Sequence, residues 1–289
     1  MCRLFGMHAG PEPTKASFWL LQAPDSLVKQ SRYEPDGAGI GTFTVAGVPV
    51  ISKEPLSALH DSTFAYEAKH LEGTTFLAHV RYASTGGHTV ENTHPFEQDG
   101  RLFAHNGVVH GLGELDDRIE LRGGSGLVLG QTDSERIFAL ITAEIRQAGG
   151  DVETGMTAAL TWIAATRPVY SLNLILASPT DLWVLRYPET HELYVLEKPD
   201  GHHGSPHVRS SRIRAHVPVL ANGRAVIIAT EKMNEDPGWR LLLPGELLHV
   251  ERSMAVSSSF PLPDSPAIPL GLADLDATAA ASQHSLPAV

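Results

Sequence analysis

The sequence has little cysteine and a shortage of positive charge. Cysteine occurs once among 289 residues, so no disulfide can form within the chain. Lysine and arginine together number 22 against 33 aspartates and glutamates, which gives a formal net charge of −11. A surface with this excess of negative charge repels phosphate groups. The composition therefore argues against a nucleic acid or an anionic membrane surface as a partner.

Long hydrophobic runs are missing as well. The sequence contains no stretch of about 18 consecutive apolar residues and no basic segment followed by an apolar one near its start. Apolar residues make up 42% and charged residues 19% of the chain, proportions typical of a soluble globular protein. We therefore expect a cytoplasmic protein without a membrane partner.

The C-terminal part of the chain differs in composition from the rest. Residues 254–289 contain no lysine or arginine but include five of the 20 prolines and many alanines and serines. Segments of this kind have too few large apolar side chains to build a core of their own. We expect residues 254–289 to form a disordered tail, and residues 2–253 to form one large folded domain.

Apolar periodicity predicts strands on both sides of a central pair of helices. The helices are expected at Asp133–Ala148 and Val152–Thr166, with a shorter helix at 14–22. Strands are expected at 2–8, 39–45, 48–52, 75–81, 102–107, 170–178, 181–187, 192–198, 225–231 and 246–252. The three strands between 170 and 198 have the spacing of a meander. This order favours an α+β fold of layered sheets and helices.

The single cysteine is the second residue, Cys2. A free cysteine in a strand can simply pack as a small apolar residue. If Met1 is removed, however, Cys2 carries a thiol and a free α-amine on one residue. An α-amine titrates at about 7.7–8.0 and can accept the thiol proton near neutral pH. Cys2 is therefore a candidate N-terminal nucleophile for acyl transfer.

Two further candidates follow expected strands. Arg81 ends the strand 75–81 and opens a loop of small residues, where a guanidinium can grip a carboxylate; a surface ion pair is the alternative. Asn106 and Gly107 follow the strand before them, and an amide with an adjacent backbone N–H can form an oxyanion hole. An Asn-Gly hairpin turn is the alternative for this pair.

The start of the first long helix supplies another candidate. Thr132 and Glu135 have the spacing of a capping box, which makes Thr132 the expected N-cap. Asp133 then lies in the first turn, where the helix dipole favours a negative charge that can bind a substrate ammonium. The alternative is that Asp133 only supports the start of the helix. The segment Asn92–Phe96 is interpreted as a fixed turn without a chemical role of its own.

Signals for metals and nucleotides are weak. The glycines at 123–126 lack the Lys-Ser/Thr ending of a phosphate-binding loop. His202, His203 and His207 lie in a loop of glycine, proline and serine without a cysteine or carboxylate at zinc-site spacing. We expect neither a metal nor an organic cofactor.

As a set, these segments resemble the class II glutamine amidotransferase domain. The resemblance covers about residues 2–253 and rests on an ordered series of motifs, namely Cys2-Arg3, HVRYAST at 79–85, NTHPF at 92–96, HNG at 105–107 and TDSE at 132–135. It implies an N-terminal nucleophile hydrolase with a four-layer αββα sandwich. It also implies that Cys2 is the nucleophile, that its own α-amine is the base, and that Asn106 and the N–H of Gly107 stabilise the oxyanion.

The same resemblance implies how the substrate is held and what happens to it. Arg81 would bind the α-carboxylate of glutamine and Asp133 its α-ammonium, while Ser84 and Gly86 would shape the pocket wall. The implied reaction is hydrolysis of a γ-carboxamide, in which ammonia or an amine leaves and water releases glutamate from a thioester. Thr85 stands where the large synthases of the family usually have histidine, and Tyr82 where tryptophan is common.

A tail of 36 residues is too short for a synthase domain, which takes about 50 residues or more. The chain therefore looks like a stand-alone member of the family. Its Met-Cys-Arg start and the segment Asp236–Val250 are similar to the γ-glutamyl amide hydrolase of ergothioneine synthesis. The expected partner is glutamine or a γ-glutamyl small molecule. Two alternatives stay open, a subunit that donates ammonia to a separate synthase and a non-catalytic glutamine sensor.

Overall fold

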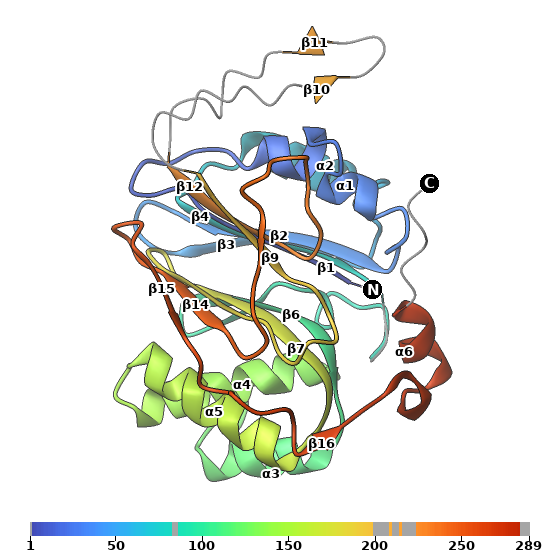
Figure 1. Cartoon of the computed structure of the whole chain (residues 1–289), viewed down its shortest axis with the longest axis vertical. Helices are drawn as coiled ribbons and strands as arrows, with labels where there is room; N and C mark the ends of the chain where they lie inside the picture. The colour runs from blue at the N-terminus through green and yellow to red at the C-terminus, as the bar shows by residue number, and fades with distance from the viewer. Residues whose placement is uncertain (1, 83–85, 199–207, 210–213, 216–223, 284–289) are drawn as a thin grey trace.

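The computed structural model of the chain describes residues 2–82, 86–198, 208–209, 214–215 and 224–283. In these residues two largely antiparallel sheets lie face to face, and helices cover the outer face of each sheet (Figure 1). The layers follow the order helix, sheet, sheet, helix. This confirms the α+β sandwich expected from the sequence.

The first sheet consists of β1 (Arg3–His8), β2 (Gly37–Phe43), β3 (Pro49–Glu54), β4 (Thr75–Arg81), β9 (Tyr194–Lys198), β12 (Ala225–Ala229) and β13 (Arg240–Leu241). Their spatial order is β13-β9-β12-β1-β4-β2-β3. β1 lies in the middle, antiparallel to both β12 and β4. The residue that precedes β1 is thereby placed beside the end of β4.

The second sheet consists of β5 (Phe96–Gln98), β6 (Arg101–Val109), β7 (Pro168–Ala177), β8 (Leu182–Leu185), β14 (Leu247–Val250) and β15 (Val256–Ser259). Their spatial order is β15-β14-β8-β7-β6-β5, and β16 (Ile268–Pro269) adds a parallel partner to β7. Two short strands, β10 (Val208–Arg209) and β11 (Arg214–Ala215), pair with each other.

Apolar side chains pack the helical layers against the two sheets. The π-helix η1 (Phe18–Gln22), α1 (Leu27–Gln30) and α2 (Ser62–His70) cover the first sheet, and α3 (Leu112–Leu121), α4 (Asp133–Gln147) and α5 (Val152–Thr166) cover the second. Phe138 of α4 stacks on Phe103 of β6, with 4.8 Å between the ring centroids. The start of α4 lies at the end of β6, where the Val109 N–H donates to the Asp133 carboxylate at 3.0 Å.

The expected cap of α4 is confirmed. The Thr132 side chain accepts a hydrogen bond from the Glu135 backbone N–H at 3.2 Å. The Glu135 carboxylate does not complete the box but accepts from the N–H groups of Leu129 and Gly130, at 3.0 and 2.6 Å. The loop before the helix is therefore tied to the first turn of the helix.

One strand lies in a different sheet from the one expected. The meander predicted for 170–198 is wrong for its third strand, because β9 pairs with β12 in the first sheet, with Val195 opposite Ile228. Residues 186–193 carry the chain from one sheet to the other. Apolar alternation indicates a strand but carries no information about its partner.

The structure also differs from the expected disordered tail at 254–289. Residues 256–259 pair with β14 as β15, β16 pairs with β7, and the chain continues into the 3₁₀ helix η3 (Leu272–Asp274) and α6 (Ala277–Ser282). Leu262 and Leu275, spaced between the prolines, are only 5% and 8% exposed. The average composition of residues 254–289 does not reveal that single side chains such as these are buried.

Candidate active site

The residues named from the sequence converge at one end of the sandwich. Cys2 precedes β1 and Arg81 ends β4, and the register that sets Arg3 opposite Val80 brings them together. Asn106 lies near the end of β6, and Asp133 is the first residue of α4. Strand and helix termini from both halves of the sandwich therefore supply the site.

Cys2 is half-buried as a residue, and its thiol is buried against the backbone of Tyr82. The Tyr82 N–H donates to Sγ at 3.2 Å, and the Tyr82 carbonyl oxygen lies 3.4 Å from Sγ, where it accepts from the thiol. Burial and the negative charge of Glu34 raise the pKa of the thiol to about 11, against the opposing effects of Tyr82 and the Arg81 charge. The thiol is thus protonated at neutral pH and needs a base before it can act as a nucleophile.

Asn106 and Gly107 lie inside β6, so the Asn-Gly turn considered as the alternative is wrong. The Asn106 side-chain amide donates to the Cys2 carbonyl oxygen at 3.0 Å. A Cβ on Gly107 would overlap the carbonyl oxygen of Ser171 on β7, so only glycine lets the two strands approach this closely. An amide donor and a backbone free of a side chain therefore lie beside the candidate nucleophile.

Arg81 is buried at the end of β4, with 3% of its surface exposed. Its guanidinium donates to the Gly87 carbonyl oxygen at 3.2 Å. Burial lowers its pKa, while the charges of Cys2, Asp36 and Asp133 act in the opposite direction. The cation is therefore surrounded by the acidic groups of the site and is not the surface ion pair considered from the sequence.

The loop after Arg81 contains the two expected wall residues. Gly86 has a φ of +75°, and a Cβ on it would press on the Asn92 side chain. Ser84 lies outside the described residues, as do His202, His203 and His207.

Asp133 is buried between the start of α4 and the end of β6. Its carboxylate accepts from the Val109 N–H at 3.0 Å and from the Ser134 N–H at 2.9 Å. Both contacts hold the carboxylate at the helix N-terminus, where negative charge is favoured. Asp133 therefore supports the helix start, as the simpler interpretation expected, and does so in the neighbourhood of Arg81.

Asn92 joins two loops of the site, a role that the sequence analysis missed. Its Nδ2 donates to the Gly87 carbonyl oxygen at 3.1 Å, and its Oδ1 accepts from the Gln131 N–H at 2.8 Å. The Gln131 side chain in turn accepts from the Gly87 N–H at 3.3 Å. The only signal for this role was an asparagine at the start of the NTHPF motif.

A charged cluster behind Cys2 was also missed. Arg3 is buried and contacts Glu34 at 3.3 Å and Glu231 at 2.5 Å. Burial is the main cause that raises the pKa of Glu34 to about 7, and it also raises the pKa of Glu231. Two carboxylates thus share one guanidinium next to the nucleophile.

Buried histidines form a second unexpected feature. The rings of His79 and His94 contact each other at a tilt of 41°, with 4.1 Å between their centroids, and neither ring has a hydrogen-bond partner among the described residues. Burial lowers the pKa of His79 to about 3 and that of His94 well below its usual value. Both rings are therefore neutral at physiological pH.

Other kinds of site are not seen in the described part of the chain. It holds no group of three or more histidine, cysteine or acidic side chains arranged for a metal ion. None of its helices combines the length and apolar character needed to cross a bilayer. A cavity of about 500 Å³ lies at the far end of β1, around His8, and is separated from Cys2 by the length of that strand, about 20 Å.

Comparison with known proteins gives the family. A model of the class II glutamine amidotransferases matches residues 1–265. The putative glutamine amidotransferase YafJ of Escherichia coli is 25% identical over 258 residues, which cover 85% of this chain and 96% of that protein. Glutamine–fructose-6-phosphate aminotransferase of Bradyrhizobium diazoefficiens is 28% identical over 184 residues, which cover 64% of this chain but only 28% of the enzyme.

Solved structures show the same fold. The glutamine phosphoribosylpyrophosphate amidotransferase of B. subtilis superposes with a TM-score of 0.64 at 18% identity, over 91% of this chain and 50% of the enzyme. A glutamine aminotransferase class-II domain protein of Silicibacter pomeroyi superposes with a TM-score of 0.59 at 20% identity, over 91% of this chain and its whole length. With the family match along most of the sequence, the chain belongs to the class II glutamine amidotransferases.

Proposed function

We propose that the chain hydrolyses the γ-amide of glutamine or of a γ-glutamyl conjugate through a thioester on Cys2. The observation that carries this proposal is that the Asn106 amide contacts Cys2 at its carbonyl oxygen while the charge of buried Arg81 acts on the Cys2 thiol. A sensor that only binds glutamine has no need of a nucleophile in this arrangement.

The proposed chemistry assigns one task to each group. After removal of Met1, the α-amine of Cys2 takes the thiol proton, and Sγ attacks the γ-carbonyl carbon. Negative charge then develops on the carbonyl oxygen, which the Asn106 amide and the Gly107 N–H stabilise. The α-amine then gives the proton to the nitrogen of the leaving group, and the C–N bond breaks as ammonia or an amine departs. Water hydrolyses the remaining thioester, which releases glutamate and restores the Cys2 thiol.

The substrate is held at its amino-acid end in this proposal. Arg81 binds the α-carboxylate and Asp133 the α-ammonium, while Ser84 and Gly86 shape the wall. The buried, unexposed position of Arg81 supports this role, since a guanidinium withdrawn from water binds a carboxylate more strongly. The resemblance of the Met-Cys-Arg start and of Asp236–Val250 to the ergothioneine-pathway hydrolase rests on the sequence alone, and it makes a γ-glutamyl conjugate a substrate to test beside glutamine.

Intact mass of the purified protein tests the nucleophile directly. We expect loss of Met1 and a single adduct with a glutamine-like electrophile, and we expect glutamine to block this adduct. Cys2→Ala should abolish both the adduct and glutamate release, without a change in thermal unfolding. Tyr82→Phe is a matched control, because the contacts of Tyr82 to Sγ come from its backbone. Glutamate release that survives Cys2→Ala would refute the proposal.

A second candidate is supply of ammonia to a separate synthase subunit. It is favoured by the comparison with the aminotransferase of Bradyrhizobium diazoefficiens, of which this chain spans only 28%. In that case glutaminase activity should rise when the partner is added, whereas a free-standing hydrolase is indifferent to it.

A further inference from the structure

The chain continues beyond the family match and returns to the candidate site. The match ends at residue 265, and we call residues 266–283 the C-terminal strap. Ala267 donates to the Ala164 carbonyl oxygen on α5 at 2.9 Å, and Leu270 donates to that of Val169 on β7 at 2.9 Å. With β16 paired to β7, the strap carries α6 to the end of the sandwich where β1 begins (Figure 1).

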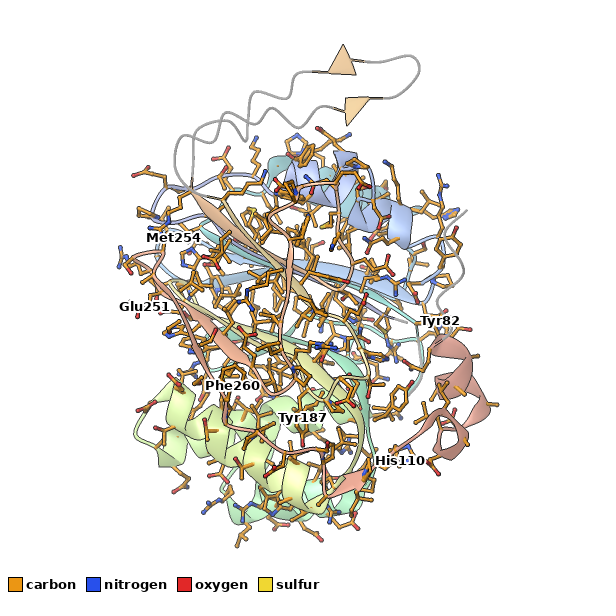
Figure 2. All side chains as sticks on the ribbon, viewed as in Figure 1. Tyr82, His110, Tyr187, Glu251, Met254 and Phe260 are labelled. Atoms are coloured by element: carbon orange, nitrogen blue, oxygen red, sulfur yellow. The ribbon has the colours of Figure 1, made fainter. Side chains whose placement is uncertain are left out.

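The strap is anchored on the strand that carries Asn106. Leu275 and Ala279 pack in one cluster with Val108 of β6 and Tyr170 of β7. Val108 follows Asn106 by two residues, so their side chains share one face of the sheet about 7 Å apart. Figure 2 shows Tyr82, whose backbone contacts the Cys2 thiol, on the same side of the molecule as α6.

His191 extends this wall toward the nucleophile. Asn173 is paired directly with Asn106 across β6 and β7, and its amide donates to the His191 carbonyl oxygen at 3.3 Å. The His191 ring meets Tyr170 edge-on, with 5.4 Å between centroids. Burial lowers the pKa of His191 to about 4, and the neighbouring Gln283 of the strap opposes that shift. The strap and the His191 ring therefore adjoin each other beside Asn106.

The strap and the loop that holds Arg81 lie on opposite flanks of β6. β6 is bordered by β5 on one side and β7 on the other. The loop of Gly87 and Asn92, which holds Arg81, leads into β5, whereas Tyr170 lies in β7. If Arg81 binds the α-carboxylate as proposed, a substrate that extends across β6 directs the group on its γ-nitrogen toward the β7 flank.

We propose that the C-terminal strap is the specificity element of the γ-amide site. Together with His191 it forms the wall on the leaving-amine flank and limits the size of the amine, so that γ-amides with a small leaving group, above all ammonia, are preferred. This inference rests on the proposed function. It assigns a role to residues that the family domain does not include.

A pair of leucines in the strap allows a matched test in the full chain. Leu275 is 8% exposed in the cluster with Val108, whereas Leu272 is 47% exposed three residues earlier. Leu275→Asp places a charge in that cluster and detaches the wall, while Leu272→Asp adds the same charge at the surface. We measure kcat/KM for glutamine and for γ-glutamyl-p-nitroanilide, whose leaving amine is bulky.

The ratio of the two kcat/KM values decides the question. We expect Leu275→Asp to raise the ratio of anilide to glutamine by about tenfold or more, the range that shape exclusion in a pocket can supply, and Leu272→Asp to leave it unchanged. If thermal unfolding shows that Leu275→Asp does not fold, Leu275→Ala takes its place with the same expected direction. An unchanged ratio in a folded, active Leu275 variant overturns the inference. A wild-type protein that releases glutamate from neither substrate instead refutes the proposed function.

Discussion

At the scale of single residues, the surroundings of Cys2 oppose its ionisation. The thiol is buried close to Glu34, and each of these two features raises its pKa. A resting thiol of this kind is protected from oxidation, because the thiolate is the reactive form. Reactivity then depends on a base beside the thiol, and in the proposed mechanism that base is the α-amine of Cys2 itself.

Glu34 provides a direct prediction about this thiol. We expect Glu34→Gln to lower the pKa of Cys2, because it removes a negative charge that disfavours the thiolate. The rate of alkylation by iodoacetamide, followed against pH, reports the shift as a lower midpoint. Glu231→Gln is the matched control, since Glu231 also contacts Arg3 but is not among the charges that act on the thiol. Equal shifts in both variants would contradict the assignment.

At the scale of elements, the contact between β6 and β7 depends on a missing side chain. We expect Gly107→Ala to destabilise the protein by about 1–3 kcal/mol, because the new Cβ would overlap the Ser171 carbonyl oxygen. Urea unfolding measures this loss. Gly113→Ala in α3 is the control, as its Cβ would meet nothing within 4 Å and alanine favours the helix by about 0.5–1 kcal/mol. We expect the free energy of unfolding to fall in Gly107→Ala and to rise in Gly113→Ala, and equal changes in the two variants would contradict this account.

The elements also show how far the sequence determines the structure. β4 and α5 begin and end at the predicted residues, because their apolar patterns and capping signals are local. The partner of β9 and the packing of Leu275 could not be predicted, since both depend on surfaces that form only in the folded molecule. The role of Asn92 could not be predicted either, because its partners, 5 and 39 residues away in the sequence, come together only in the folded chain.

At the scale of the whole molecule, buried histidines predict sensitivity to acid. The pKa of His79 is lowered to about 3 and that of His191 to about 4, below the value near 6.5 of an unfolded chain. The unfolded state therefore binds more protons as the pH falls below about 6.5, so the free energy of unfolding decreases by up to about 1.4 kcal/mol per pH unit and histidine. Glu34, whose pKa is raised to about 7, acts in the opposite direction.

Substitution of His79 separates the contribution of this histidine to the pH dependence from that of Glu34. We expect His79→Phe to reduce the loss of stability between pH 7.5 and pH 5, because one buried site that must stay neutral is removed. Urea midpoints of wild type and variant at the two pH values provide the measurement. The difference between the two pH values, rather than the stability itself, carries the result, since the ring exchange also alters packing. The same pH dependence in both proteins would show that His79 is protonated without cost in the folded state.

The central position of β1 has a consequence for the order of events during synthesis. β1 pairs with β4 on one side and with β12, residues Ala225–Ala229, on the other. The second partner leaves the ribosome only when most of the chain has been made. Until then β1 can pair with β4 but not with β12, so the removal of Met1 that the proposed mechanism requires has that interval before the sheet is complete. Translation speed thereby sets the time available for the processing step on which the proposed activity depends.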